Sequence, residues 1–331
     1  MINKNEKELA RRARELGITG WRALAPMRFD AWKPRRPARG MTADPEAVLP
    51  GATAMLVLMA AYRPWRDWPD PSLWVHPHYP AYHRLRQAAL ELVSWIKAQG
   101  WRAADAHRLP QRHAAFAAGF GTAGVNGMII HPGYGSRICF YTILTDMPLP
   151  LTAPVTGEMR RCDACGACET GCPAGALRGC SRVDAQRCLR SYAPMRREIP
   201  EPVRMMLGAR LMGCDECQSV CPINRDLTPV DPPEELLRAT RLAGLLDWGS
   251  DAWREQLTLL GSMIGANEAR AVRTTAAAAM HTGNTGDPRF LPALNRLESH
   301  PDERVREMAT WAARRIRRPD ASVSGNDNRA D

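Results

Sequence analysis

Helix-type and strand-type hydrophobic patterns are mixed along the first part of the chain. Apolar residues recur at helical spacing in residues 5–16 and again, over a longer stretch, in Tyr82–Gln99. The apolar run Met55–Met59 and the stretch Ile138–Leu144, which is rich in β-branched and aromatic residues, are typical of buried strands. We therefore expect residues 1–150 to form a domain in which helices pack on a sheet.

The remaining sequence falls into segments of different character. The proline-rich stretch at 147–157 predicts a linker. Cysteines dominate the segment that follows, and after the prolines at 229–233 the pattern is helical as far as Arg318. We expect a cysteine-rich domain over 158–228, a helical domain over 232–318 and a polar, disordered tail over 319–331.

An internal repeat lies in the helical part. Val272–Ala279 and Val305–Ala312 share a Val-Arg start and alanines at matching positions, at an offset of 33 residues. A further helix, introduced by Asp287-Pro288, is expected between them. Helix pairs that repeat at this period are typical of a short α-solenoid.

The same repeat places basic residues at equivalent positions. Arg273 and Arg306 are one period apart, with Arg270 and Arg304 nearby, so these four side chains are expected to form a basic ladder along one face. Such a ladder suits a phosphate backbone, because each guanidinium can make a bidentate contact. The alternative is that the arginine stems only cover the apolar edge of the repeat.

The overall charge is strongly basic, with 45 lysines and arginines against 35 acidic residues and a net charge of +10. This surplus favours an anionic partner, nucleic acid before a membrane surface, although a solvated basic surface would carry the same charge. The polar N-terminus shows no apolar export segment, and the longest apolar run, Ala54–Tyr62, is far below the ~20 residues of a membrane-spanning helix. We expect a cytoplasmic protein without membrane association, whose ten cysteines stay reduced.

The spacing of those cysteines points to iron–sulfur clusters. Cys162, Cys165, Cys168 and Cys172, followed by Pro173, reproduce the C-x2-C-x2-C-x3-C-P run of bacterial ferredoxins. In two-cluster ferredoxins the first three cysteines bind one [4Fe–4S] cluster and the fourth binds the other. A zinc site would use two cysteine pairs per metal and would leave the third cysteine of this run without a role.

A second run of three cysteines follows, formed by Cys214, Cys217 and Cys221 ahead of Pro222. If the crossing rule holds, Cys221 completes the first cluster. Cys172 then joins Cys214 and Cys217 on the second cluster, which lacks one ligand.

Three cysteines are candidates for that last ligand. Cys139 alternates with apolar neighbours in a predicted strand and is expected to be a small core residue. Cys180 follows a glycine in a predicted turn, and Cys188 begins a predicted helix. Spacing alone does not choose between the last two.

A glycine-rich segment in the first domain suggests a second ligand. Gly119–Gly124 contains G-x-G-x-x-G, but the preceding Gln111–Ala118 is predicted helical, whereas a dinucleotide fingerprint follows a strand. We interpret the segment as a turn whose backbone approaches a large ligand, the alternative being a plain tight turn. Clusters pass single electrons, so either this domain holds another cofactor or the protein is an electron carrier.

Together these motifs resemble the epoxyqueuosine reductase family, cobalamin-dependent iron–sulfur enzymes that complete queuosine in tRNA, over most of residues 50–318. The stretch Cys214–Asn224 is similar to the family's second cluster motif, and Leu144–Leu149 resembles the end of its reductase domain. Gln186-Arg187-Cys188 matches the family's remaining cluster ligand, which selects Cys188 over Cys180. The Trp-Ala-Ala stretch at 311–313 resembles its HEAT-like, tRNA-binding domain.

The resemblance implies an α+β protein with an α/β corrinoid-binding reductase domain, a ferredoxin-like domain with two [4Fe–4S] clusters and a HEAT-like α-helical repeat. It implies cobalamin as cofactor, and tRNA and a low-potential electron donor as partners of a monomer. Asp105, a carboxylate in a predicted loop, falls on the family's proton-donating aspartate when aligned without gaps from Gly119. Such a general acid would need a raised pKa, most simply from burial beside the corrinoid. The residues implied at the corrinoid are Tyr62, Asn126, Ile129, Ser191 and Asp215.

The sequence also departs from the family pattern. Thr122 and Val125 stand where the family has tryptophan and lysine, and Ala81-Tyr82-His83 replaces Asp-Tyr-His. These changes concern the substrate and corrinoid pocket, so a corrinoid-dependent reductase of a non-tRNA small molecule, like the related reductive dehalogenases, is one alternative. A two-cluster electron-transfer protein is another. Asp105 argues against the plain carrier, and the basic helical repeat argues for RNA.

Overall fold

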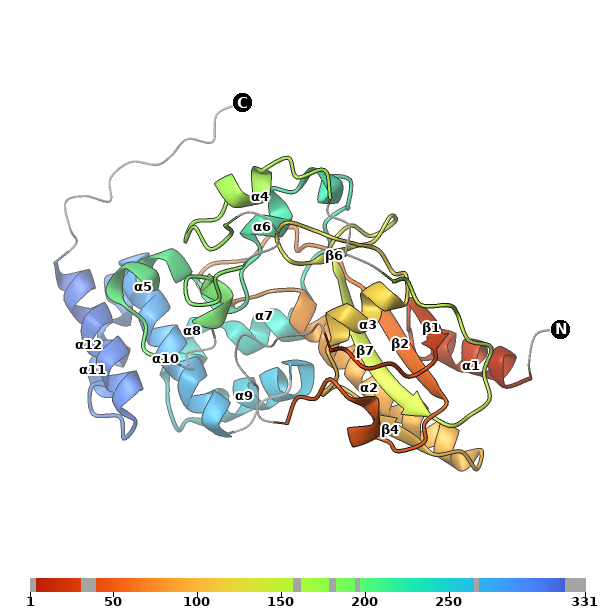
Figure 1. Ribbon diagram of the computed structural model, residues 1–331. Helices are drawn as coiled ribbons and strands as arrows, with labels where there is room; N and C mark the ends of the chain where they lie inside the picture. Colours follow the sequence, from red (N-terminus) through yellow and green to blue (C-terminus); the bar gives the residue numbers. More distant parts are fainter. Residues whose placement is uncertain are drawn as a thin grey trace. The chain divides into compact units, whose positions relative to one another are not determined.

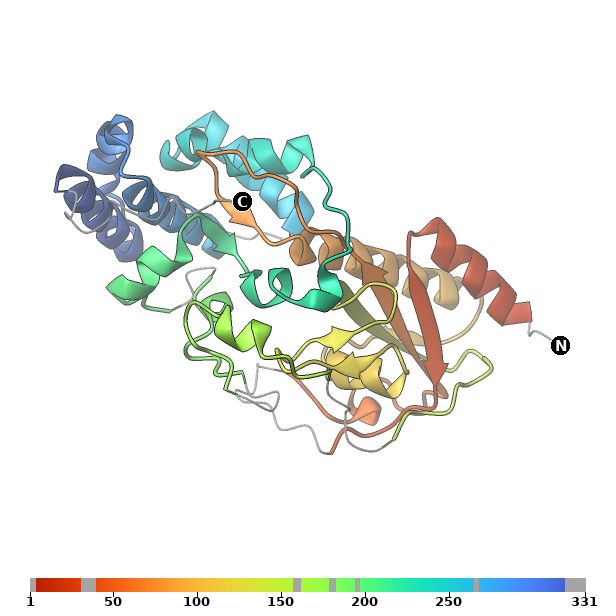
Figure 2. The ribbon, with the colours of Figure 1, turned by 90° about the horizontal axis from the view of Figure 1, so that it is seen from above.

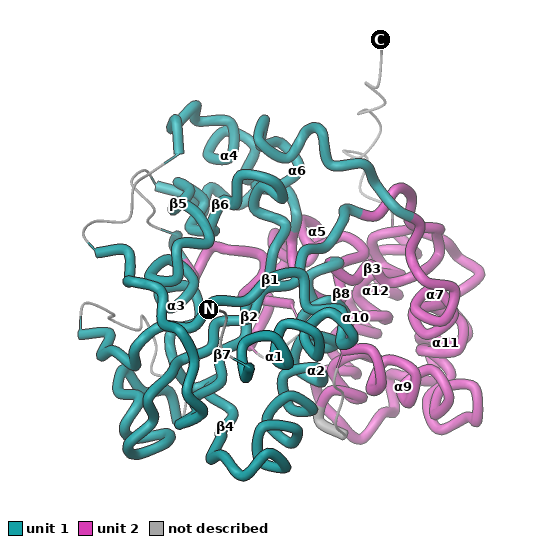
Figure 3. The backbone as a smooth tube through the Cα atoms, turned by 90° about the vertical axis from the view of Figure 1, so that its right-hand side faces the viewer, with its two compact units in different colours: residues 1–64, 77–184, 215–230 teal, residues 65–76, 185–214, 231–331 magenta. Residues whose placement is uncertain are grey.

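The computed structural model describes residues 4–30, 40–156, 162–178, 183–193, 197–264 and 268–318. The chain forms two compact units that alternate along the sequence (Figure 3). Unit 1 comprises residues 1–64, 77–184 and 215–230, and unit 2 comprises residues 65–76, 185–214 and 231–331. The predicted tail at 319–331 and Cys180 lie outside the described residues.

A four-stranded antiparallel sheet forms the centre of unit 1 (Figure 1). In spatial order its strands are β1 (Gly20–Leu24), β2 (Ala54–Ala61), β7 (Ile138–Thr145) and β4 (Ala103–Asp105). β2 and β7 pair along their whole length, with Ala54 opposite Thr145 and Ala61 opposite Ile138. The two predicted strands are confirmed, and nearly all of their residues are buried because both faces of the sheet are covered.

Helices α2 (His78–Ala98) and α1 (Lys4–Glu15) cover one face of this sheet, which is seen with them in Figure 2. On that face Leu85 and Leu92 of α2 share a core with Leu56 of β2. Both helices were predicted from periodicity, but α2 begins at His78 rather than at Tyr82 because prolines are tolerated in a first turn.

The other face of the sheet packs against α3 (Gln111–Ala117). Its core combines Val57 of β2 and Phe140 of β7 with the alanines of α3. Short elements complete unit 1, and the predicted linker has neither helix nor strand over its described residues 147–156. The short elements are η1 (Pro45–Ala47), the hairpin β5 (Thr122–Ala123) and β6 (Ile129–Ile130), α4 (Ala167–Thr170), α6 (Glu216–Ser219) and η3 (Pro222–Asn224).

Unit 2 is mainly helical. A parallel two-stranded sheet of β3 (Trp74–Val75) and β8 (Arg210–Met212) accompanies η2 (Leu189–Ser191) and α5 (Glu201–Leu207). The helices predicted beyond the second proline stretch are present, and none of the described helices has the length and apolar character needed to span a bilayer. They are α7 (Glu234–Thr240), α8 (Leu242–Leu246), α9 (Asp251–Ile264), α10 (Glu268–Thr285), η4 (Pro288–Phe290), α11 (Leu291–Leu297) and α12 (Glu303–Arg317).

The two copies of the sequence repeat fall on α10 and α12, which pack against each other. Alanines such as Ala276 and Ala309 are fully buried between them. A Cβ atom on Gly283 of α10 would lie 2.8 Å from the Cα of Ala312, so only glycine allows so close an approach at that position. Together, the sheet of unit 1 and the helices of both units confirm the predicted mixture of helix and sheet.

Candidate functional site

Four cysteines from the two ferredoxin-type runs line one cavity in unit 1. Cys162, Cys165 and Cys168 come from the loop before α4 and from α4 itself, and Cys221 comes from the turn after α6. The cavity has a volume of about 140 Å³, and its other lining residues are mostly small or apolar. These are the four cysteines that the sequence assigns to the first cluster.

The donor set fits a [4Fe–4S] cluster. Within the described ranges, no three His, Cys, Asp or Glu side chains gather closely enough to hold a single metal ion. A cubane places irons and sulfides between its ligands, so its cysteines surround a volume instead of meeting at a point. Burial raises the pKa of the Cys168 thiol, and the neighbouring Cys162 and Cys221 raise it further. A cluster that binds here would displace this proton, because cysteine ligates metals as the thiolate.

The glycine-rich segment holds the first cysteine run in place. The backbone N–H of Cys162 donates to the carbonyl of Ala123 in β5, at 3.0 Å. A Cβ atom on Gly121 would lie 2.1 Å from the carbonyl oxygen of Ile130 in β6. At Gly121 the chain thus approaches itself closely, within the hairpin that carries the first run, and the expected approach to a large ligand stays a prediction.

Asn126, at the turn of that hairpin, also lines the cysteine cavity. Its side-chain oxygen accepts from the Met128 N–H at 3.1 Å, and its Nδ2 donates to the carbonyl of Cys217 at 3.4 Å. Asn126 therefore joins the hairpin to the second cysteine run. The corrinoid contact that the resemblance implies for Asn126 stays a prediction.

A buried polar network fastens the second run to the loop before β7. Nδ2 of Asn224 donates to the Ser136 hydroxyl at 2.9 Å and to the Gln218 carbonyl at 2.7 Å, and Oδ1 accepts from the Ser136 N–H at 2.9 Å. Nε2 of Gln218 donates to the Ser136 carbonyl at 2.8 Å. Gly135 makes room for this network, since a Cβ there would lie 2.1 Å from Oδ1 of Asn224.

A bidentate ion pair adds to this attachment. Both guanidinium nitrogens of Arg137 donate to the carboxylate of Asp215 at 3.0 Å, with only 3% of the Arg137 side chain exposed. Sequence reasoning missed Arg137, Ser136, Gln218 and Asn224 because their roles depend on contacts between distant segments. The one sequence signal for these residues was the Cys-Pro-Ile-Asn motif that ends at Asn224.

The remaining cysteines are distributed over both units. Cys172 and Cys217 belong to unit 1, whereas Cys188 and Cys214 belong to unit 2, so the ligand set of the second cluster stays a prediction. The Sγ atom of Cys172 accepts a hydrogen bond from the Ala176 N–H at 3.2 Å. Cys139 is a buried core residue as predicted, and burial raises the pKa of its thiol to about 12.

Asp105 is the last residue of the edge strand β4 rather than part of a loop. Its Oδ1 accepts hydrogen bonds from the Tyr141 hydroxyl at 2.8 Å and from the His107 N–H at 2.9 Å. Its Oδ2 lies 2.8 Å from Nδ1 of His107, and the carboxylate is 23% exposed. The strand and its neighbour β7 therefore hold this carboxylate in a fixed, partly open position.

These contacts set the acidity of the carboxyl group. Burial raises the pKa of Asp105, but the hydrogen bonds from His107 and Tyr141 outweigh burial and leave it lowered. The raised pKa expected of a general acid is thus absent in the protein alone. Burial, with the nearby Asp105 charge, raises the pKa of Tyr82 to about 12, so the phenol beside this site stays protonated.

The residues implied at the corrinoid have diverse surroundings. Tyr62 is buried with its hydroxyl 3.3 Å from Oε1 of Gln218, and Ile129 is buried in β6. Asp215 is the partner of Arg137, Asn126 lines the cysteine cavity, and Ser191 ends η2 in unit 2. A shared contact with a corrinoid remains a prediction for all five.

Three of the four arginines of the predicted ladder contact residues at or near the ends of helices. Arg270 donates to the Ile264 carbonyl at 2.6 Å, and Arg306 donates to the carbonyls of His300 and Pro301, each at 2.7 Å. Arg304 pairs with Asp302 at 2.9 Å, and Arg273 lies partly buried in α10. Their proposed role at RNA is not tested by these contacts.

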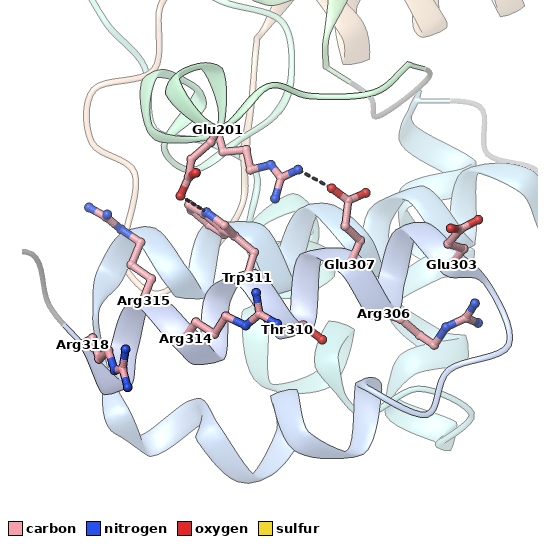
Figure 4. Close-up of a pocket in the computed structure, with 10 residues that line it drawn as sticks. Glu201, Glu303, Arg306, Glu307, Thr310, Trp311, Arg314, Arg315 and Arg318 are labelled. Carbon is pink, nitrogen blue, oxygen red and sulfur yellow. Dashed lines mark hydrogen bonds and ion pairs between the residues drawn. The ribbon is translucent and has the colours of Figure 1, made fainter.

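A basic, aromatic groove lies between α5 and α12 in unit 2 (Figure 4). Its volume is about 700 Å³, and Trp311 lies in it with the indole N–H donating to Glu201 at 2.8 Å. The guanidinium groups of Arg204 and Arg315 lie 5.6 and 5.9 Å from the indole ring centre. Arg204 also pairs with Glu307. Sequence reasoning named Trp311 only as part of the Trp-Ala-Ala stretch at 311–313 that resembles the family's HEAT-like, tRNA-binding domain.

Comparison with known proteins decides the family. The 4Fe-4S double cluster binding domain matches residues 161–224. The epoxyqueuosine reductase of Pseudomonas aeruginosa is 31% identical over 285 residues, which cover 81% of this chain and 74% of that protein. This chain belongs to the epoxyqueuosine reductase family. It is therefore related to oxidoreductases, in agreement with the resemblance seen in its motifs.

Solved structures share the fold of this family member. A crystal structure of epoxyqueuosine reductase with an epoxyqueuosine-modified tRNA-Tyr stem loop matches with a TM-score of 0.76 and 24% identity, covering 96% of this chain and 91% of that one. A catabolic reductive dehalogenase in complex with 3-bromo-4-hydroxybenzoic acid matches with a TM-score of 0.51 and 16% identity. The match covers 85% of this chain and 36% of the dehalogenase chain. At these identities the likeness concerns the fold alone.

Proposed function

We propose that this protein reduces epoxyqueuosine to queuosine in tRNA, using two [4Fe–4S] clusters and cobalamin. One observation carries the proposal: unit 1 joins a cysteine-lined cavity to the sheet that presents Asp105. The connection runs through Ser136 and Arg137, which bind the second cysteine run and directly precede β7, the neighbour of β4. An electron-transfer centre and a proton donor therefore share one rigid support.

The side chains of the chain have distinct tasks in this reaction. When bound, the clusters supply single electrons and the corrinoid supplies a strongly reducing metal centre. Asp105 donates a proton to the oxygen released from the epoxide, while Tyr141 and His107 hold its carboxylate in place. Substrate that covers the partly exposed carboxyl would remove water from it, and this desolvation raises its pKa toward the working pH.

For the clusters we propose the ligand sets given by the motifs. The first cluster takes Cys162, Cys165, Cys168 and Cys221, and the common cavity supports this set. The second takes Cys172, Cys188, Cys214 and Cys217, which rests on the spacing rule and the family resemblance. Both sets agree with the double-cluster domain matched at residues 161–224.

The RNA surface that we propose includes the groove between α5 and α12 as well as the predicted ladder. Arg314 and Arg318 are exposed and one helical turn apart on its rim, and within the described residues neither side chain has a hydrogen-bond or ion-pair partner. They are suited to phosphate contacts, and the indole of Trp311 offers a stacking surface for a base. Arg306 belongs to both the ladder and the groove.

Anaerobic reconstitution with iron, sulfide and cobalamin, followed by incubation with tRNA carrying epoxyqueuosine, tests the function. We expect queuosine among the digested nucleosides, detected by mass spectrometry, when a strong reductant is present. Cys168→Ala serves as the control without an intact first cluster. Absence of queuosine despite full cluster and cobalamin content would exclude the tRNA substrate.

A corrinoid-dependent reduction of a small molecule is the second candidate. Thr122 and Val125 in the hairpin, and Ala81 in α2, replace residues typical of the family at the expected pocket. The likeness to a reductive dehalogenase concerns the fold alone and says nothing about the substrate of this chain. Turnover of halogenated phenols, with none on tRNA, would favour it.

A further inference from the structure

We propose that electrons enter through the first cluster, delivered by an acidic one-electron carrier protein that docks on an apolar patch formed by Val220, Pro222 and Ile223. Pro222 and Ile223 line the cysteine cavity, and Val220 directly precedes the cavity residue Cys221. Val220 is 40% exposed and Ile223 is 41% exposed. The patch therefore lies at the outer edge of the cavity that fits the first cluster.

The position of Val220 is set by a glycine in the other cysteine run. A Cβ atom on Gly171 would lie 3.0 Å from both methyl groups of Val220, which is tighter than most contacts of real Cβ atoms. Because Gly171 has no side chain, Val220 can pack directly against this position of the first run. The two motif helices, α4 and α6, contact each other at this place.

The two cysteine runs differ at equivalent positions. In the first run Gly171 and Ala174 flank the Cys-Pro pair, whereas in the second run Val220 and Ile223 occupy the same places. The apolar pair therefore marks only the run whose Cys-Pro cysteine, Cys221, lines the first cavity. Because this exposed apolar pair lies beside the first cavity alone, it favours the first cluster as the point where electrons enter.

Exposed apolar side chains at this edge suit a redox partner. Electron-transfer complexes are small and transient, and an uncharged core with a polar rim provides such an interface. Cys165, the exposed cysteine of the cavity, would hold the edge of a bound cluster near the surface, and a short distance to the surface favours electron transfer. No atom moves in the transfer: the reduced carrier loses one electron and the first cluster gains it.

The net charge of the whole chain, rather than the charge of the rim, favours an acidic carrier. Arg225, two residues after Ile223, is exposed at the rim, where Asp163 and Asp226 are also exposed. The local rim is mixed, so the net charge of +10 on the whole chain decides the long-range attraction. Flavodoxins and low-potential ferredoxins with acidic surfaces are the class of partner that fits.

Reduction kinetics of the reconstituted protein test the proposal without tRNA or turnover. Reduced flavodoxin, as the acidic carrier, and dithionite, as the small reductant, are mixed with the wild type and with Val220→Asp/Ile223→Asp, and cluster bleaching is followed by absorbance. We expect the double variant to be reduced about tenfold more slowly by flavodoxin and at an unchanged rate by dithionite. Leu151→Asp, at an apolar residue that is 48% exposed in the same unit, is the matched control.

Other results would overturn the proposal. An unchanged flavodoxin rate in the double variant, or an equal slowing in Leu151→Asp, shows that the patch is not the docking site. If the double variant loses iron, Val220→Ser/Ile223→Ser replaces it, with the same expectation of slower reduction by flavodoxin alone. Faster reduction by a basic carrier than by flavodoxin would contradict the assigned charge. Because the readout is cluster reduction, failure here leaves the proposed tRNA activity standing.

Discussion

Nδ1 of His107 lies 2.8 Å from one carboxylate oxygen of Asp105, while the Tyr141 hydroxyl lies 2.8 Å from the other. Both oxygens of the proposed proton donor are therefore held by the protein. Tyr141 approaches from the fully buried neighbouring strand, whereas the His107 ring is 52% exposed. One contact fixes the geometry, and the other connects the carboxyl group to solvent.

Replacing Asp105 by asparagine should remove the proton donor without disturbing its surroundings. The amide keeps the size of the carboxyl group and can still accept a hydrogen bond from Tyr141 or His107. We expect iron content and cobalamin binding close to the wild type, with turnover lowered by about 10²–10⁴-fold. Single-turnover assays on modified tRNA measure this, and full activity would remove Asp105 from the mechanism.

His107→Ala should change the pH dependence of the reaction. The imidazole hydrogen bond lowers the pKa of Asp105, so its loss raises that pKa. Asp105 acts in its protonated form, and activity falls as pH rises through its pKa. The alkaline limb of the kcat profile should therefore move to higher pH.

A second substitution provides the comparison for this pH effect. Tyr141→Phe removes another hydrogen bond that lowers the pKa of Asp105, so it should move the limb in the same direction. A limb that stays in place or moves to lower pH in both variants would contradict the assignment of Asp105 as the acid.

Cysteine substitutions should separate the two clusters. Wild-type protein should hold about eight irons, as two cubanes require. Cys188→Ala should lower the iron content by damaging the second cluster, and Cys180→Ala should leave both clusters intact. Iron analysis with electron paramagnetic resonance of the reduced protein measures the outcome. Loss of iron in Cys180→Ala alone would reverse the ligand assignment.

Arg314→Ala with Arg318→Ala should weaken tRNA binding without lowering thermal stability, because both side chains are exposed. The log–log dependence of affinity on salt should flatten by roughly 0.7–0.9 per lost phosphate contact. Arg254→Ala, which removes an exposed arginine paired with Asp251 on α9, is the control. Unchanged affinity and salt dependence would exclude the groove rim from RNA binding.

The predicted ladder makes a separate claim. Arg273→Ala with Arg306→Ala should also weaken tRNA binding and flatten its salt dependence, with both clusters intact. This variant should in addition unfold at a lower temperature, because Arg306 binds two carbonyls before α12. Lower stability with unchanged affinity would show that the ladder is structural.

Gly135→Ala should loosen the second cysteine run. The residue has a φ of +55°, and its new Cβ would lie 2.1 Å from Oδ1 of Asn224. Displacing that amide leaves buried polar groups unpaired, so we expect a loss of about 1–3 kcal/mol in unfolding free energy. Urea denaturation measures the loss. Gly133→Ala, whose Cβ would be 3.7 Å from its nearest neighbour, should change stability little, and equal effects would contradict the steric argument.

The sequence predicted elements whose signal is local. β2 was found because it is a continuous apolar run, β7 because it is rich in β-branched and aromatic residues, and α2 because its periodicity extends over several turns. β1 and β4 were missed because a short strand is defined by its partners, here Met55–Met59 and Ile143–Thr145. Asp105 was for that reason expected in a loop.

The candidate site divides in the same way. Cysteine spacing identified the four residues around the first cavity, because the cysteines of each cluster motif are only a few residues apart in the sequence. The anchors of that motif could not be predicted, since Ser136 and Asn224 meet only after the sheet and the second run have formed. The lowered pKa of Asp105 likewise depends on Tyr141, a residue 36 positions away.

The alternation of the two units along the chain has a consequence for biosynthesis. Unit 1 includes residues 215–230, so its last segment leaves the ribosome only after segments 65–76 and 185–214 of unit 2 have already emerged. Cys221 belongs to that last segment, so the first three cysteines of its cavity wait in an incomplete chain. Assembly of the proposed first cluster on all four of these cysteines must then follow translation of the second run.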